Sequence, residues 1–213
     1  PLRLVGSEMC IRDRFQGARL SFYMLLLLSL PVLINTHYIL VIWLKIVPEH
    51  AVLFVRLIMI FAMCESISNP LITAMLATGK IRNYQIVVGG LQLLNLPLSY
   101  ICLKTGFVPE SILVVAIIIS LACLFARLYM LRGMIGLSSI LYMKNVFLNV
   151  LVVALLSTII PYMLFCYMKE TFFSFIIITL IAVLCTLVVE FYIGCNQLSL
   201  IHISEPTRRR GIS

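Results

Sequence analysis

The stretch AVLFVRLIMIFAMCESISNPLITAMLATGKIRNYQ, residues 51–85, decides the fold class of this chain. It opens with an apolar run long enough to cross a bilayer, which takes about 20 helical residues. The run carries Arg56 and Glu65, and it ends in the basic turn ATGKIRNYQ. Because charged side chains inside lipid are costly, those that occur there commonly mark functional sites. We therefore predict that residues 51–76 form a transmembrane helix with a polar face.

That face extends along the second half of the helix. At about 100° per residue, five polar side chains fall within one broad arc: Glu65, Ser66, Ser68, Asn69 and Thr73. Pro70 lies among them, lacks a backbone donor and so frees the carbonyl of Ser66. We expect this arc to face other helices or water and to line a transport path.

Composition places the whole chain in the membrane class. Hydrophobic residues make up 62% of the sequence and charged residues 11%, whereas soluble domains carry about 25% charged residues. We predict an all-α polytopic bundle of six transmembrane helices. The expected spans are residues 20–44, 51–76, 86–103, 111–131, 146–165 and 171–191.

Several of these spans contain proline or asparagine residues. Pro31, Pro70 and Pro97 are expected to kink or loosen three successive helices. Asn35, Asn69 and Asn95 are expected to form hydrogen bonds between helices. Residues 132–145 are expected to form a longer basic connection between the fourth and fifth spans.

Basic residues predict the orientation of the bundle, because cytoplasmic loops carry an excess of lysine and arginine. One set of helix ends holds six such residues: Arg19, Lys80, Arg82, Arg127, Arg132 and Lys144. The opposite set holds three: Lys45, Lys104 and Lys169. We predict that the first set faces the cytoplasm.

Both ends of the chain have an unusual origin. The peptides LVGSEMCIRDR (residues 4–14) and LSLIHISEPTR (residues 198–208) resemble translations of one DNA segment on opposite strands, similar to a transposon-derived sequencing adapter. We expect residues 1–14 and 198–213 to be artefactual and to make no packed contacts with the bundle. Residues 15–197 keep ten Lys and Arg against five Asp and Glu, so the net charge falls from +8 to +5. No nucleic-acid partner is therefore predicted from the basic tail.

Arg56 and Glu65 are the two charges that need an explanation. Arg56 lies near one end of its span, where it either extends to the headgroups or faces a cavity. Glu65 lies about 21 Å along the helix from Ala51, so it must be protonated, paired or exposed to an aqueous cavity. The two are nine residues apart on opposite faces, which excludes an ion pair within the helix.

Patterns for catalysis, metals and cofactors are missing. ATGK fails the phosphate-loop pattern, because Ala74 replaces its first glycine and Ile81 follows the lysine. His37 and His50 have no metal-ligand spacing. We predict no enzyme activity, no metal and no cofactor.

Two longer runs carry a family resemblance. ILVIWLKIVPEHAVLFVRL (residues 39–57) and NPLITAMLATGKIRNYQIVVGGLQLLNLPLSYICLKTGFVPE (residues 69–110) resemble the oligosaccharide flippase branch of the multidrug/oligosaccharidyl-lipid/polysaccharide exporter superfamily. Lys45 stands where that family usually has glycine, and its later glycine-rich motif is present only in part, as Thr105-Gly106.

The resemblance implies that residues 15–197 belong to the C-terminal lobe of a longer transporter of 12–14 helices. It implies a multi-pass protein of the bacterial inner membrane that moves polyprenyl-diphosphate-linked oligosaccharide across the bilayer for cell-surface polysaccharide, by alternating access. Cationic groups would meet the diphosphate. The candidates for the substrate path are Arg56, Glu65, Ser68, Asn69, Thr73, Lys80, Arg82 and Arg127.

Two alternatives stay open. The first is a drug or cation antiporter of the same superfamily, in which Glu65 would exchange a proton or sodium as coupling ion. The second is a membrane-embedded glycosyltransferase or polymerase. That class needs acidic or histidine clusters in large extramembrane loops, and the loops in this sequence are short.

Overall fold

A computed structural model describes residues 2–79, 81–135 and 139–195, with side chains for residues 15–79, 81–134 and 140–193. These residues form helices and connecting turns, with no strand among them. The helices are α1 Leu2–Ile34, α2 Thr36–Leu44, α3 Ala51–Ala77, α4 Ile81–Leu93, α5 Asn95–Lys104, α6 Ser111–Ile135, α7 Ser139–Tyr142, α8 Leu148–Tyr167 and α9 Phe172–Val189. Two π-helices, η1 Met143–Phe147 and η2 Glu190–Cys195, precede α8 and follow α9.

Six helical segments of the described chain are long and apolar enough to cross a membrane. They are Phe15–Ile34, Ala51–Ala77, Ile81–Lys104, Ser111–Met134, Ile140–Tyr167 and Phe172–Ile193. The prediction of an all-α polytopic bundle with six spans is thus confirmed, and the chain is a multi-pass membrane protein.

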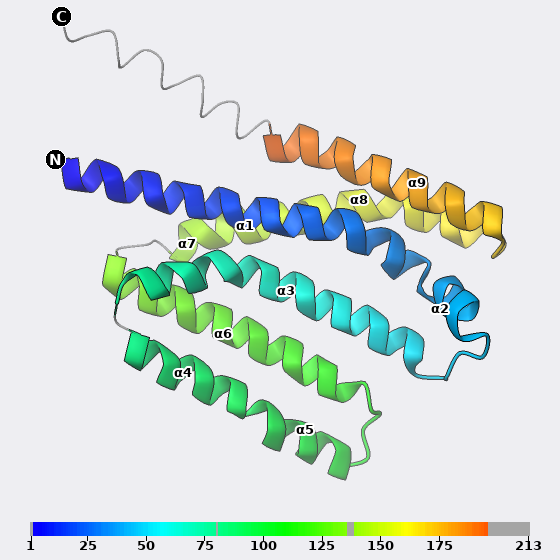
Figure 1. Ribbon diagram of the computed structural model, residues 1–213, viewed down its shortest axis with the longest axis horizontal. Helices are drawn as coiled ribbons and strands as arrows, with labels where there is room; N and C mark the ends of the chain where they lie inside the picture. The colour runs from blue at the N-terminus through cyan, green and yellow to red at the C-terminus, as the bar shows by residue number, and fades with distance from the viewer. Residues whose placement is uncertain (1, 80, 136–138, 196–213) are drawn as a thin grey trace, which may run out of the picture.

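The predicted boundaries of the first span were wrong. Helix α1 ends at Ile34, and α2 starts in a new direction after Asn35 (Figure 1). The Asn35 side-chain amide donates to the carbonyl of Pro31 at 3.1 Å, and the Thr36 hydroxyl donates to that of Val32 at 2.7 Å. Such local bonds compete with the helical ladder. Asn35 therefore helps to end its own helix and does not form the expected bond between helices.

Two other boundaries also differ from the prediction. The third span begins at Ile81, inside the turn expected before it. Its helix is interrupted at Leu94, one turn before Pro97, because the proline ring clashes with the carbonyl four residues earlier. The basic connection expected over residues 132–145 is largely helical, since α6 runs to Ile135 and helix resumes at Ser139. Tyr142 and Val146 are fully buried there, so packing favours helix over loop.

The helices form two groups that meet where α1 packs against α3 (Figure 1). In one group α3, α4 and α5 pack against or beside α6, and in the other α1, α8 and α9 pack together. Successive spans run up and down, so the α2–α3, α5–α6 and α8–α9 connections share one end of the bundle (Figure 1). Lys45, Lys104 and Lys169 lie at this end.

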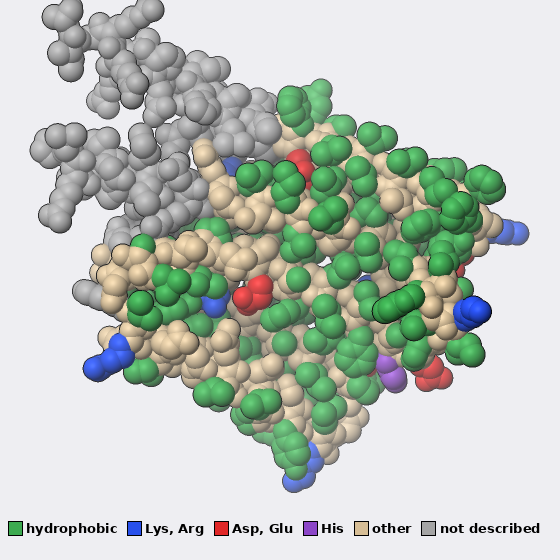
Figure 2. Space-filling model, viewed as in Figure 1, with side chains coloured by type: hydrophobic (Ala, Val, Ile, Leu, Met, Phe, Trp, Pro, Cys, Tyr) green, Lys and Arg blue, Asp and Glu red, His purple; other side chains and the backbone are tan. Residues whose placement is uncertain are grey.

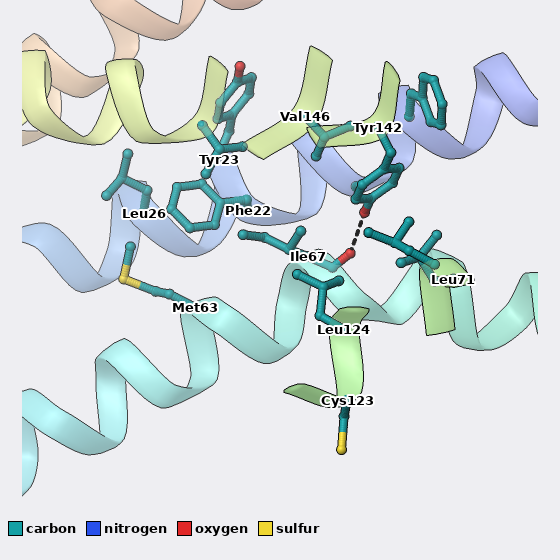
Figure 3. Packing of buried hydrophobic residues seen from close by; sticks show 14 of the residues in the cluster. Phe22, Tyr23, Leu26, Met63, Ile67, Leu71, Cys123, Leu124, Tyr142 and Val146 are labelled. Carbon is teal, nitrogen blue, oxygen red and sulfur yellow. Dashed lines mark hydrogen bonds between the residues drawn. The ribbon is translucent and has the colours of Figure 1, made fainter. Parts of the chain in front are cut away.

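The core joins the two groups, and Tyr142 lies in it (Figure 3). Its hydroxyl donates to the carbonyl of Ile67 on α3 at 2.7 Å, and its ring meets that of Phe15 edge-on at 5.3 Å. Helix α3 continues unbroken through Pro70. The tyrosine thus bonds the carbonyl next to that of Ser66, which Pro70 leaves without a backbone donor.

The predicted artefactual ends fall largely outside this description. Helix α1 already begins at Leu2, but the side chains of residues 1–14 and all of residues 198–213 are outside the described residues. The expectation that they make no packed contacts stays a prediction.

Candidate functional site

A polar cleft opens between the spans of the α3–α6 group. Its volume is about 230 Å³, and its lining residues come from four helices: Phe61 and Glu65 of α3, Gln92 of α4, Asn95 of α5, and Ala116, Ile119 and Ser120 of α6. The face of the molecule in Figure 2 is mainly hydrophobic, with few charged groups inside that area. A cleft with a carboxylate, a hydroxyl and two amides is therefore a distinctive surface in this bundle.

Glu65 is held in the cleft by a neighbouring helix. The Ser120 hydroxyl donates to Oε1 of Glu65 at 2.5 Å, which joins α3 to α6. Gln92 and Asn95 can each donate and accept hydrogen bonds. Together these groups can bind sugar hydroxyls, a proton or a small cation.

Arg127 lies seven residues beyond Ser120 on α6, so both share one face of the helix at a separation of about 10.5 Å along its axis. The side chain is 2% exposed, and its Nε and Nη1 have no hydrogen-bond partner among the described residues. A buried guanidinium is costly unless an anion or acceptor satisfies it. This cation is therefore suited to receive an anionic group.

Cys123 lies between the two charged residues. Its thiol is fully buried, one helical turn from Ser120 on one side and from Arg127 on the other. Its Sγ lies 4.0 Å from the carbonyl of Val88 on α4. The carboxylate and the guanidinium thus belong to one continuous seam between α3, α4 and α6, which we call the Glu65–Arg127 seam.

The structure divides the other predicted site residues among different environments. Ser68 is fully buried, with no hydrogen-bond partner for its hydroxyl among the described residues. Asn69, Thr73 and Arg82 are exposed, and the Thr73 hydroxyl donates to its own helix at Pro70. Lys80 lies outside the described residues. The polar arc predicted for α3 therefore has an inner part, beside other helices, and an outer part.

Arg56 lies in a third environment. Its Nε donates to the carbonyl of Leu33 at 3.1 Å, near the end of α1. The last carbonyls of a helix lack partners within that helix, and a positive charge there is favourable. Arg56 is half-buried, and this contact gives it a role in ending α1.

Sequence reasoning missed two polar residues of the cleft. Gln92 could have been recognised, because a glutamine within an apolar span is as unusual as Asn95, three residues later in the same span. Ser120 carried no such signal, since single serines are common in membrane helices. Asn95 was expected to bond between helices, but its side-chain oxygen accepts from Ser99 of its own helix at 3.3 Å.

No group of three or more His, Cys, Asp or Glu side chains that could hold a metal ion occurs within the described part of the chain. Comparison of the chain with protein-family models, with curated proteins and with solved structures finds no match in any of the three.

Proposed function

We propose that this chain is part of a flippase of the bacterial inner membrane that moves polyprenyl-diphosphate-linked oligosaccharide for cell-surface polysaccharide by alternating access. The transporter performs no covalent chemistry. Its cargo has a polar sugar, an anionic diphosphate and an apolar tail. A path for it needs hydrogen-bonding groups and cations within the membrane, while the tail stays in lipid.

Arg127 is the observation that carries this proposal. A guanidinium in the interior of a membrane helix bundle, with two nitrogens that have no hydrogen-bond partner among the residues described, favours an anionic ligand in one state of a transport cycle. Phosphate oxygens suit it, because arginine forms paired, charge-assisted hydrogen bonds with them. Glu65, Gln92 and Asn95 in the adjoining cleft offer complementary contacts for sugar hydroxyls.

A local feature of the backbone supports the family resemblance behind this proposal. Lys45, at the position where the flippases usually have glycine, has a φ of 61° and a ψ of −47°. The amide of Ile46 donates to the carbonyl of Leu44 at 2.7 Å across it, which makes a γ-turn centred on Lys45. Glycine adopts such a positive φ without strain, so the backbone here has the form that the family's glycine would favour.

The test is glycan export by the full-length protein carrying Arg127→Gln or Arg127→Lys. We expect Arg127→Gln to lower export about tenfold or more, since hydrogen bonds to charged groups contribute about 1.5–3 kcal/mol. Arg127→Lys should keep part of it. Arg132→Gln is the matched control, because Arg132 is exposed on the same helix.

Thermal stability separates transport from folding in this experiment. Replacing a buried cation, two of whose nitrogens have no partner among the described residues, should leave the folded protein at least as stable as before. Normal export by a stable Arg127→Gln protein would overturn the proposal, and a protein that unfolds would assign Arg127 to packing.

The antiporter alternative is favoured by one observation, the short hydrogen bond between Ser120 and Glu65, because a carboxyl held in a membrane cleft can carry a coupling proton or bind sodium. Glu65→Gln and Glu65→Leu distinguish the two functions. A flippase that uses Glu65 for hydrogen bonding keeps much of its transport with Gln and loses it with Leu. An antiporter that uses its charge loses transport with both. Wild-type export from both variants would exclude Glu65 from the path.

A further inference from the structure

Both histidines that the structure describes are paired with glutamates, at the same end of the bundle. His50 contacts Glu110 and His37 contacts Glu170. The two glutamates belong to different helical hairpins. Neither pair belongs to the Glu65–Arg127 seam, and neither is explained by the proposed transport path.

The first pair is short and partly shielded from solvent. Nδ1 of His50 lies 2.6 Å from Oε1 of Glu110, and the Glu110 side chain is 8% exposed. His50 directly precedes α3, and Glu110 directly precedes α6. This contact therefore joins the start of α3 to the α5–α6 turn, within the α3–α6 group.

The second pair is more exposed, but an aromatic contact accompanies it. Nδ1 of His37 lies 3.0 Å from Oε2 of Glu170, with half of the histidine side chain exposed. Next to it, the rings of Tyr38 and Phe175 lie 5.4 Å apart. Both contacts join α2 to the α8–α9 hairpin, in the other helix group.

Residues 36–50, which we call the 36–50 strap, comprise α2 and the connection to α3. One pair holds the strap near each of its ends, and the pairs reach the two different helix groups. The strap lies across one end of the bundle, where α1 and α3 meet (Figure 1). Loosening either pair would release one end of the strap from the hairpin turn that it contacts.

We propose that the 36–50 strap is a pH-dependent closure of this end of the bundle: protonated His37 and His50 hold it to both hairpin turns, and their deprotonation loosens it. Histidine ordinarily changes charge between about pH 5 and 8. When cationic, each histidine forms an ion pair, and when neutral it keeps only a hydrogen bond. The pH response of the strap does not depend on the cargo that the protein moves. Only the placement of the strap at the outer face of the membrane rests on the predicted orientation.

Glu110 stays charged over the pH range in which histidine ordinarily changes charge. The hydrogen bond from its own backbone, and then the bond with His50, lower the pKa of Glu110 below the ordinary 4.5, against an opposing effect of burial. The closure is therefore strongest below about pH 6.5, the ordinary histidine value, and weakens as pH rises. It also weakens in strong acid, once the glutamates are protonated.

Other charges at this end modulate the closure without replacing it. Lys45 and Glu49 lie in the strap, Lys104 ends α5, and Lys169 precedes Glu170. Arg56 faces the end of α1 through Leu33. Among ordinary side chains, histidine is the one that changes charge between about pH 5 and 8. A response within this range is thus assigned to the histidines.

The test is backbone hydrogen exchange of the full-length protein in lipid nanodiscs at pH 5.5 and pH 8.0, corrected for the intrinsic pH dependence of exchange. We expect protection of the strap to fall about two- to fivefold per pair on going to pH 8.0, as for partly exposed ion pairs. Protection of α9 around Ala182 should stay constant. Equal strap protection at both pH values would overturn the proposal, and this comparison needs no variant.

Four variants assign the response to the pairs: two single histidine changes, their combination and one control. His37→Gln and His50→Gln keep a hydrogen-bonding side chain that cannot gain charge, and each should remove about half of the pH response. Glu49→Gln is the control, an exposed carboxylate in the strap, and should leave the response intact. A response that survives in the double histidine variant, or that follows one histidine alone, would contradict a strap closed at both ends.

Discussion

The two helix groups treat their polar residues differently. In the α1, α8 and α9 group, the hydroxyls of Thr158 and Thr186 donate to carbonyls of their own helices at 2.7 Å, and Tyr23 donates to Asn149 at 2.5 Å. In the α3–α6 group, Glu65 and Ser120 meet in an open cleft, and two nitrogens of the Arg127 guanidinium have no partner within the described part of the chain. Buried polar atoms without a hydrogen-bond partner among the described residues also occur in the first group, at Ser157, Thr179 and Glu190. The second group differs in that Glu65 and Ser120 line an open cleft of about 230 Å³, where they can meet a ligand.

The largest expected effect comes from placing a large ring in each group. Ala116 lines the cleft, and Ala182 is fully buried in α9. We expect Ala116→Phe to fold normally and to lower glycan export about tenfold, because the ring occupies space that the cargo needs. Ala182→Phe should instead lose about 1–3 kcal/mol of folding stability by overpacking.

Export by the full-length protein and its thermal stability are the two measurements for this pair. Ala122→Phe, at an exposed position of α6, is the control and should change neither. If Ala116→Phe unfolded the protein and Ala182→Phe did not, the distinction between an open and a packed group would be wrong.

The second prediction concerns the residue that joins the groups. Tyr142→Phe removes the donor to the Ile67 carbonyl, in the helical turn that Pro70 weakens. We expect the free energy of unfolding to fall by about 1 kcal/mol, above the average for hydrogen bonds between membrane helices. Equilibrium unfolding in mixed micelles measures it. If Tyr142→Phe lowered the free energy of unfolding by less than Tyr23→Phe, the hydrogen bond between the two helix groups would contribute no more than a bond within one group.

The third prediction tests the packed group by itself. Tyr23→Phe removes the hydrogen bond between α1 and Asn149 of α8. The expected cost is about 0.6 kcal/mol, the mean for such bonds in membranes, with export unchanged. Lost export in a protein of normal stability would place part of the transport path in this group.

The smallest effect is expected for Thr186→Val. This fully buried hydroxyl donates within its own helix, and valine has nearly the same shape. A neutral side chain that bonds only to its own helix should change the free energy of unfolding by less than about 0.5 kcal/mol. Unfolding in mixed micelles, compared with Tyr23→Phe, provides the measurement. A larger loss would show that this hydroxyl has a partner on another helix.

Much of the candidate site could be predicted, but only one helix at a time. The depth of Glu65 and Arg127 follows from their positions in apolar runs, since each residue adds about 1.5 Å along a helix. Asn69 and Thr73 face outward, whereas Ser68 is buried. This difference depends on the rotation of α3 between α1 and α6. Periodicity defines an arc on one helix, and the neighbouring helices decide which part of the arc is covered.

Local sequence by itself determined that this chain forms apolar helices long enough to span a membrane, because hydropathy and helix length are properties of contiguous residues. Only the tertiary structure decided that Ser120 meets Glu65 and that His50 meets Glu110, 55 and 60 residues apart. It also decided that α1 ends at Ile34, where Asn35, Thr36 and Arg56 bond its last carbonyls. Such contacts depend on helix rotation and on where each helix stops, which packing energies set jointly across the chain.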